Sequence, residues 1–509
     1  MISLLLVAQV SLPQAGPRAL KPPPPPPPPP PNILIVLVDD IGVDQVGCYA
    51  VNYPTLAEQP CTPNIDALAA AGMRFTNAWS SPVCAPTRAL LQTGRPAYRT
   101  GVGTNTSPEL TNFNTGLQLE EPTLARLLPD YANAALGKWH LSDWFFDNND
   151  IQHPIALGYH SYAGTEYGIG GAGYNDWTKT LYPAGVKIHH YNVYATLDTT
   201  DDALQRIASL PEPWLLYIGY NGAHEPLHCP LDQGYPAQPS PPGVCATDWC
   251  FDCSQLLSSP SYASYPPDVV QARAVGQALD LEIGRLLAAV DFSDTALILS
   301  SDNASTKRSV VPPFPIDHVK GTLYQGGVNV PLIVAVPGGL TGVCHELVQM
   351  TDMYSTVAEL AGVALPPDPL RDSVSLVQHV APWWTSPSSA PRPYAYAEAF
   401  APNFVPDAAG SPPADYKAAF HDRTVRNGTH KLIEKCSWDA TQATCVTSLE
   451  LYELASEPPQ DPALGPDPHE QVDLMLDPSS WSQTTSEAYA ELLELLTFVY
   501  PRLPVGECP

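Results

Sequence analysis

Unbroken apolar stretches recur along the first two thirds of the chain and are separated by segments with helical patterning. The clearest stretch is Asn32–Val38, which is almost entirely aliphatic and is followed by Asp39 and Asp40. A stretch that is apolar at every position, and not only at alternate ones, is typical of a strand buried on both faces. We expect further strands of this kind at 132–137, 214–220, 296–300 and 332–336.

Helical segments lie between these strands. Thr62 and Pro63 predict a helix that runs to about Ala71, because proline is well tolerated in the first turn of a helix. Further helices are expected at 122–128, 269–290 and 352–361. The alternation of buried strands and helices predicts an α/β fold over residues 32–365, in which helices flank a central, mostly parallel sheet.

The chain changes character after residue 365. Residues 366–415 are rich in Pro, Ser and Ala, which favours a linker or an irregular excursion. Beyond it, 424–434 and 448–454 are expected to be antiparallel strands, and 486–500 has the pattern of an amphipathic helix. We therefore expect a smaller α+β domain over residues 416–509.

Residues 1–31 predict a leader followed by a spacer. Residues 2–10 form a short apolar run like the core of a signal peptide, and residues 22–31 are consecutive prolines, which favour a stiff polyproline II spacer. A leader of this kind indicates a secreted or periplasmic protein. No apolar run reaches the roughly 18 residues that a membrane-spanning helix needs, so we expect no transmembrane segment.

Composition narrows the range of functions. The 509 residues include 52 Asp and Glu against 24 Lys and Arg, a formal net charge of −28, which argues against a nucleic-acid binder. Eleven cysteines are present, and six of them form two local groups: Cys229, Cys245, Cys250 and Cys253, and then Cys436 and Cys445. Such groups favour disulfides in an oxidising compartment, with the last pair flanking an expected hairpin. The spacing Cys250-x-x-Cys253 also leaves a zinc or redox site open.

The chemically most distinctive motif is a Cys-x-Pro-x-Arg pentapeptide that begins at Cys84. Pro86 suits an early position in a helix, so we expect Cys84 near a helix N-terminus, where unpaired N–H groups and the helix dipole favour anions. Arg88 lies one turn further along the same face and can neutralise negative charge that develops at position 84. Taken alone, the motif also fits a buried structural cysteine in front of a helix.

This motif, with its surroundings at 81–95, resembles the signature of the type-I, formylglycine-dependent sulfatases, the arylsulfatase-like members of the alkaline phosphatase superfamily. Four further blocks are similar to that family and occur in this order: Asp39-Asp40, Gly137-Lys138-Trp139-His140, Ser301-Asp302-Asn303, and a block from His318 to Gly327 that contains Lys320. The resemblance implies an alkaline-phosphatase-like sandwich. It also implies that a formylglycine-generating enzyme oxidises Cys84, which would leave ten cysteines, enough for five disulfides.

The resemblance also implies a metal site, whose ligands would be Asp39, Asp40, Asp302, Asn303 and a hydroxyl of the converted Cys84. Adjacent carboxylates at a buried strand end repel each other, and a cation removes that cost. An all-oxygen ligand set suits a hard cation, so we expect one Ca²⁺, with Mg²⁺ as the alternative.

Catalytic roles follow from the same resemblance for six residues: Cys84, Arg88, Lys138, His140, His224 and Lys320. The hydrated aldehyde at position 84 would attack the sulfur of a sulfate ester while Asp302 accepts its proton. Lys138, His224 and Lys320 would bind the sulfate oxygens, and His224 or Lys320 would protonate the leaving alcohol. His140 would then remove a second proton as sulfate leaves.

The segment from His224 to His228 also fits the HExxH pattern of zinc proteases. That chemistry needs both histidines on one face of a continuous helix, and Pro226 within the motif argues against such a helix. We therefore favour the interpretation in which His224 follows a sheet strand and contacts substrate, with His228 at the rim of the substrate site.

We expect a sulfatase that acts on aryl or carbohydrate sulfate monoesters. Two other functions stay open. A phosphonate or phosphate monoester hydrolase of the same superfamily shares the Cys-x-Pro-x-Arg signature. A catalytically silent, secreted metal-binding homologue would keep the same residues but leave Cys84 unconverted.

Overall fold

The computed structural model describes most of the chain: residues 29–50, 60–106, 115–142, 152–169, 173–236, 253, 256, 265–381, 391–439, 444–454, 467, 469–500 and 502–505. The expected leader and most of the proline run fall outside these residues, as do Cys245 and Cys250. No helix in the described part of the chain is both long enough and apolar enough to cross a membrane.

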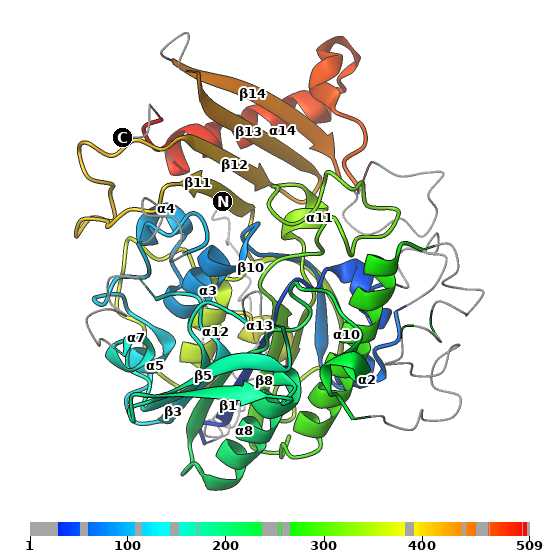
Figure 1. Ribbon diagram of the computed structural model, residues 1–509. Helices are drawn as coiled ribbons and strands as arrows, with labels where there is room; N and C mark the ends of the chain where they lie inside the picture. Colours follow the sequence, from blue (N-terminus) through cyan, green and yellow to red (C-terminus); the bar gives the residue numbers. More distant parts are fainter. Residues whose placement is uncertain are drawn as a thin grey trace, which may run out of the picture.

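A ten-stranded mixed sheet forms the centre of the larger part of the molecule (Figure 1). Its strands are β1 (Asn32–Val38), β2 (Met73–Trp79), β3 (Ala132–Lys138), β4 (Ser161–Thr165), β5 (Asp176–Tyr182), β6 (Val186–Tyr191), β7 (Trp214–Gly219), β8 (Thr295–Ser301), β9 (Leu332–Ala335) and β10 (Gly342–Gln349). Their spatial order is β10-β2-β9-β8-β1-β7-β3-β4-β5-β6. The neighbours β8, β1, β7, β3 and β4 run parallel, while β9, β5 and β6 pair antiparallel.

The longer helices are α2 (Pro63–Ala71), α3 (Cys84–Thr93), α8 (Ala195–Ser209), α10 (Pro267–Leu287) and α12 (Asp352–Leu360). The shorter ones are α1 (Gly47–Ala50), α4 (Ala97–Thr100), α5 (Leu124–Leu127), α7 (His153–Ala156), α11 (Gln325–Val328) and α13 (Val377–Val380), with 3-10 turns at Val43–Gln45, Pro230–Gln233, Leu474–Leu476 and Pro478–Ser480. The helix expected at 122–128 is therefore a single turn. The other expected helices differ from the observed ones by a few residues at their ends.

Helices cover both faces of the large sheet, which explains why its central strands are mostly apolar on both faces. In β1, Leu34 and Val36 belong to a core shared with α2, α8 and α10. Ile33 and Ile35, on the opposite face, belong to a second core shared with α3 and α12. Successive residues of a strand point to opposite faces, so a strand with two covered faces is mostly apolar on both. The expected α/β architecture is confirmed.

A smaller antiparallel sheet follows in the C-terminal part. It consists of β11 (Ala395–Ala401), β12 (Phe420–Arg426), β13 (His430–Asp439) and β14 (Thr444–Glu453), in that spatial order. Helix α14 (Gln483–Glu494), extended by a π-helical turn at Leu495–Val499, packs against β13 (Figure 1).

Two expectations for this part differ from the structure. The single strand expected at 424–434 is two strands, because Asn427 Oδ1 accepts hydrogen bonds from the backbone N–H groups of Thr429 and His430 and so forms a tight turn. The stretch 366–415, expected to be a linker or irregular, contains β11. Alanine-rich sequence has low intrinsic strand propensity, and β11 forms because it pairs along its whole length with β12.

Two disulfides lie within the described residues, Cys229–Cys253 and Cys436–Cys445. The second is the pair that the expected hairpin indicated, and the first joins two members of the predicted cluster. Cys48 and Cys344, however, are free, as is Cys84. Ten cysteines besides Cys84 would be enough for five disulfides, but Cys48 and Cys344 are unpaired, so not all five form. Sequence spacing identifies local pairs, but it cannot show that Cys48 and Cys344 stay unpaired after folding.

Candidate active site

Four adjacent parallel strands, β8, β1, β7 and β3, end at one edge of the large sheet, and each brings predicted site residues there. These are Asp302 and Asn303 after β8, Asp39 and Asp40 after β1, His224 in the loop after β7, and Lys138 and His140 at the end of β3. The carboxyl ends of parallel strands are where open α/β sheets bind their ligands. The topology thus gathers residues that are far apart in the sequence.

Cys84 is the first residue of α3 and meets this group of strand ends. Its Sγ lies 3.4 Å from Asp39 Oδ1, 3.6 Å from Lys138 Nζ and 3.5 Å from Lys320 Nζ. The next backbone N–H, that of Ala85, donates to Asn105 Oδ1. The side chain of Cys84 is completely buried, and burial, together with the nearby carboxylates, raises the pKa of its thiol above the ordinary value. The unmodified residue is therefore a neutral thiol.

Two lysines neutralise the pair of aspartates after β1. Lys138 Nζ lies 2.5 Å from Asp39 Oδ2, and Lys320 Nζ lies 2.5 Å from Asp40 Oδ1. Burial alone would raise the pKa of Asp39, but the positive charge of Lys138 and of the other nearby cations outweighs it and holds this pKa well below its ordinary value. Asp39 is therefore ionised over the whole physiological pH range.

Arg88 is fully buried and its hydrogen bonds hold the neighbouring strand ends together. Its Nε and Nη2 donate to Asp302 Oδ2 at 3.0 and 2.7 Å, and its Nη1 donates to the carbonyl oxygen of Lys138 at 2.6 Å and to Tyr217 Oη at 3.2 Å. The fork-shaped guanidinium thus fixes the carboxylate after β8 relative to the end of β3. Burial, with the nearby charge of Asp39, raises the pKa of Asp302 above its ordinary value.

The residues of this group fit a divalent cation. Asp39, Asp40, Cys84 and His224 each offer one ligand atom, and these atoms all lie within 4.8 Å of one another. Asn303 Nδ2 donates to Asp40 Oδ1 at 2.7 Å, while Asn303 Oδ1 is buried without a hydrogen-bond partner among the described residues. A buried, unpaired carbonyl oxygen beside carboxylates is the donor chemistry that a hard cation satisfies. His224, which the sequence analysis assigned to substrate, lies within this same group.

Hydrogen bonds to backbone carbonyls fix how two histidines present their nitrogens. His140 Nε2 lies 3.1 Å from the carbonyl oxygen of Thr106, which can only accept, so Nε2 carries the proton. Its Nδ1 is buried without a partner among the described residues. Burial and the charge of Lys138 lower the pKa of His140 well below its ordinary value, so the ring is neutral and Nδ1 offers a lone pair. His224 Nδ1 likewise donates to the carbonyl oxygen of Glu225, which leaves Nε2 as the other nitrogen.

The backbone is strained at two of these positions. Asp40 and His140 have φ angles of 62° and 58°, and only four non-glycine residues of the described chain have positive φ. Non-glycine residues in this region cost free energy and are found where the surrounding structure holds them for function. Gly137 has a φ of 73°, and a Cβ there would lie 2.0 Å from the carbonyl oxygen of Gly219, so glycine lets β3 and β7 meet closely at the site.

Trp139 stands between two predicted site residues but faces the hydrophobic core. Its ring makes edge-to-face contacts with Tyr159 and Tyr217, and its Nε1 donates to His153 Nδ1 at 2.9 Å. Trp139 therefore anchors the end of β3 in the core, while its two neighbours in the sequence, Lys138 and His140, belong to the site.

The zinc-protease alternative is excluded by the local structure, because residues 224–228 form no helix. His228 Nε2 and Tyr194 Oη form a hydrogen bond of 3.0 Å, and the His228 ring packs against Tyr174 with centroids 4.3 Å apart. His228 is thus a buried packing residue and does not lie at the rim of the site, as the sequence analysis expected.

Sequence reasoning missed Asn105 and Tyr217. Asn105 caps the start of α3, and Tyr217 supports the guanidinium of Arg88. Tyr217 lies within an apolar strand and Asn105 in an irregular segment, so neither position carries a pattern that distinguishes it. Only the folded arrangement brings them to the site.

Comparison with known proteins gives one family and many structures of the same fold. The family described as Sulfatase matches residues 31–363, well over half of the chain. Human arylsulfatase A is 27% identical over 471 residues, which cover 87% of this chain and 83% of that protein. Human steryl-sulfatase is 26% identical over 412 residues, 68% of each chain. The uncharacterized sulfatase YdeN of Escherichia coli is 27% identical over 364 residues, 64% of this chain and only 57% of its own length.

Solved structures share the fold at lower sequence identity. The structure of Ps i-CgsB in complex with k-i-k-neocarrahexaose has a TM-score of 0.64 and 20% identity, covering 94% of this chain and 95% of its own. That of BT4656 in complex with D-glucosamine-2-N,6-O-disulfate has a TM-score of 0.61 and 18% identity, covering 91% of this chain and 97% of its own. At such identities the likeness concerns the fold alone.

Proposed function

The chain belongs to the sulfatase family, a family of sulfuric ester hydrolases, and we propose that it hydrolyses aryl or carbohydrate sulfate monoesters through a formylglycine made from Cys84. The observation that carries this proposal is the position of Cys84 at the start of α3, with Sγ within 3.6 Å of two lysine ammonium groups and one carboxylate. A helix N-terminus with two lysines beside it is an environment for an anion such as sulfate.

Formylglycine, when hydrated, supplies two hydroxyls on one carbon, one to attack sulfur and one to lose a proton as sulfate leaves. Lys138, Lys320 and His224 bind the sulfate oxygens, and the positive charges of the two lysines offset the charge that develops in the transition state. Asp302, which Arg88 holds in place through two hydrogen bonds, would accept the proton of the attacking hydroxyl.

The leaving alcohol needs a proton, and the remaining hydroxyl must lose one. His224 or Lys320 supplies the proton for the alcohol, since both side chains are partly exposed to solvent. His140 takes the second through Nδ1, the nitrogen that its bond to the Thr106 carbonyl leaves unprotonated. The two protons thus move on separate residues, and no water molecule has to attack sulfur.

We propose one Ca²⁺, or else Mg²⁺, as the cation, held by Asp39, Asp40, Asp302, Asn303 and the residue at position 84. When bound, the ion polarises the sulfate ester and the hydroxyl at position 84. The three carboxylates are already matched by Arg88 and two lysines. A divalent ion therefore makes the site net positive and ready for an anionic substrate.

Conversion of Cys84 requires a formylglycine-generating enzyme in the host. We also propose that the protein is secreted or periplasmic, and the two disulfides support an oxidising compartment. The intact mass of the peptide that contains Cys84 tests the conversion directly, because replacement of the thiol by an aldehyde changes that mass.

Parallel assays with 4-nitrophenyl sulfate, 4-nitrophenyl phosphate and an aryl phosphonate test the reaction itself. We expect a higher kcat/KM for the sulfate, because one hard cation and fixed monovalent charges suit a singly charged ester better than a dianion. Faster turnover of phosphate or phosphonate would favour the hydrolase alternative. A protein with unconverted Cys84 and no turnover of any of the three would be the silent metal-binding homologue.

A further inference from the structure

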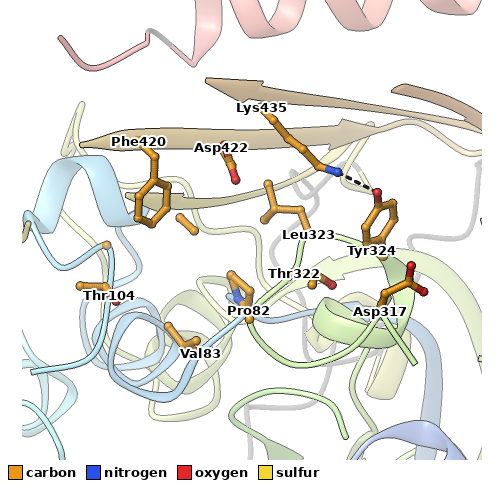
Figure 2. Close-up of a pocket in the computed structure, with 13 residues that line it drawn as sticks. Pro82, Val83, Thr104, Asp317, Thr322, Leu323, Tyr324, Phe420, Asp422 and Lys435 are labelled. Atoms are coloured by element: carbon orange, nitrogen blue, oxygen red, sulfur yellow. Dashed lines mark hydrogen bonds between the residues drawn. The ribbon is translucent and has the colours of Figure 1, made fainter. Parts of the chain in front are cut away.

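A cavity of about 390 Å³ lies between the C-terminal sheet and the loops that lead to position 84. In Figure 2, Phe420, Asp422 and Lys435 extend from the sheet toward the loops below. On the other side of the cavity lie Val83 and Thr104. Such a volume falls within the range of small-molecule sites and can hold one or two sugar rings.

Three residues that line this cavity are neighbours, in the sequence, of residues in the active site. Val83 is followed by Cys84, Gly321 is preceded by Lys320, and Thr104 is followed by Asn105, which caps α3. The backbone N–H of Gly321 donates to the carbonyl oxygen of Pro82 at 2.8 Å, which joins two of the segments that line the cavity. The cavity therefore borders the segments of chain that carry Cys84 and Lys320.

The charges that line the cavity are predominantly negative. Asp422 and Asp317 contribute two carboxylates. Lys435 contributes the single ammonium group among the lining residues, but its Nζ already binds Glu450 Oε1 at 2.6 Å and Tyr324 Oη at 2.7 Å. That cation is thus neutralised within the protein, and a second anion on the substrate would meet carboxylates without an available positive partner.

The remaining lining suits the faces and hydroxyls of a sugar. Phe420 offers aromatic surface, on which the C–H face of a pyranose packs. The ring of Tyr324 is already covered, because it stacks on His318 with centroids 3.5 Å apart and Lys435 Nζ lies 4.7 Å from its centroid. Carboxylates such as Asp422 accept hydrogen bonds from sugar hydroxyls, which always carry a donor. The net charge of −28 further disfavours the approach of polyanionic chains.

We propose that this cavity binds the sugar of a singly sulfated carbohydrate that carries no second anionic group, and that Asp422 and Asp317 select against sugars with a further sulfate or carboxylate. The inference rests on the proposed sulfatase function and specifies the substrate class of the same site.

The test uses the converted full-length protein and a panel of hexose and N-acetylhexosamine monosulfates, each paired with the same sugar carrying a second sulfate. Hydrolysis of 4-nitrophenyl sulfate serves as the reference reaction. We expect the best monosulfate to exceed its disulfated counterpart in kcat/KM by about tenfold or more. In Asp422→Asn, which keeps an acceptor for the backbone N–H of Cys436, that preference should fall at least about threefold. Asp422→Ala should raise KM for the monosulfate.

The matched control is Asp415→Asn, which removes one negative charge from an exposed position outside the cavity lining and should leave the preference unchanged. Equal turnover of both members of each pair, or an unchanged preference in Asp422→Asn, would overturn the inference. So would hydrolysis of the aryl sulfate with no turnover of any sugar sulfate. Absence of all sulfatase activity from protein with a converted Cys84 would instead refute the proposed function.

Discussion

Cys84 lies where a helix begins and where three charged side chains meet, and both features suit an anionic group better than a neutral thiol. Burial and the nearby carboxylates raise the pKa of this thiol, so it is not ionised near neutral pH. The two lysines within 3.6 Å of Sγ pair with Asp39 and Asp40 and face a neutral thiol at position 84. At the scale of single residues, the site is prepared for a ligand and not for a thiolate.

The first prediction concerns this residue. Cys84→Ala should lower kcat/KM for 4-nitrophenyl sulfate by about 1,000-fold or more, because it removes the proposed nucleophile of the proposed covalent mechanism. The melting temperature should change by only a few degrees, since alanine fits the same space. The matched control is Cys344→Ala, which removes another free cysteine outside the site and should retain activity. Substantial turnover by Cys84→Ala would contradict the assignment of the nucleophile.

The second prediction concerns Asp302. Asp302→Asn removes a proposed metal ligand and the ionic partner of Arg88, so elemental analysis after dialysis should find less than about a tenth of the wild-type calcium. The free energy of unfolding should fall by about 3 kcal/mol, because the buried guanidinium loses its carboxylate. Asp291→Asn, at an exposed position just before β8, is the control and should keep both metal and stability. A full complement of calcium in Asp302→Asn would remove this residue from the ligand set.

At the scale of secondary structure, the central strands could be predicted from the sequence because each is mostly apolar and is followed by polar residues. That pattern, with the resemblance, located Asp39, Asp40, Asp302 and Asn303 at strand ends. It could not give the partner of Arg88, because the contact with Asp302 joins residues 214 positions apart and depends on strand order. Periodicity reports which face of an element is buried, but not which element lies beside it.

The two misassigned elements have different causes. Strand β11 (Ala395–Ala401) lies in an alanine-rich segment of low strand propensity and is stabilised by its partner β12, so tertiary pairing outweighs local propensity. The turn between β12 and β13 contains Asn427-Gly428, a dipeptide typical of tight hairpin turns, so the sequence did carry a signal for this boundary.

The third prediction tests how β3 is anchored. His153 is buried between Trp139 Nε1 and the carbonyl oxygen of Leu117, and burial lowers its pKa from 6.5 to about 4. As the pH falls below 6.5, the unfolded chain binds a proton before the folded chain does, so stability present above pH 6.5 is lost on the way to pH 4. This group should account for about 3 kcal/mol of that loss.

His153→Gln is the matched comparison, because glutamine keeps an acceptor and a donor but does not titrate. Urea unfolding at pH 7.5 and pH 4 should show a smaller loss of free energy in the variant than in the wild type, by about 3 kcal/mol. All other titrating groups are shared by the two proteins and cancel in the difference. Identical losses would show that His153 is not the group responsible.

At the scale of the whole molecule, the C-terminal sheet holds the loop that carries Lys320. Lys431, on β13, donates through Nζ to the carbonyl oxygen of Leu323 at 2.5 Å. Glu470 accepts a hydrogen bond from the backbone N–H of Gln325 and lies 2.6 Å from Lys431 Nζ. The segment from Leu323 to Gln325 begins three residues after Lys320, so the C-terminal part contributes to the geometry of the site from the far side of the cavity.

The last prediction tests this connection through the pair Lys431 and Glu470, both of which are completely buried. Lys431→Met leaves the carboxylate of Glu470 buried without its cation, which should lower the free energy of unfolding by about 3 kcal/mol. The double variant Lys431→Met with Glu470→Gln removes both charges and should recover at least half of that loss, because the penalty comes mainly from the unpaired charge. Urea unfolding of the wild type, both single variants and the double variant measures this coupling.

Activity separates the positional role from stability. If the pair positions the Lys320 loop, the double variant should stay folded but show a kcat/KM for 4-nitrophenyl sulfate that is lower by about tenfold. A double variant with wild-type activity would show that the C-terminal sheet supports the fold without setting the geometry at Lys320, and additive losses of stability in the two single variants would show that the charges are not coupled.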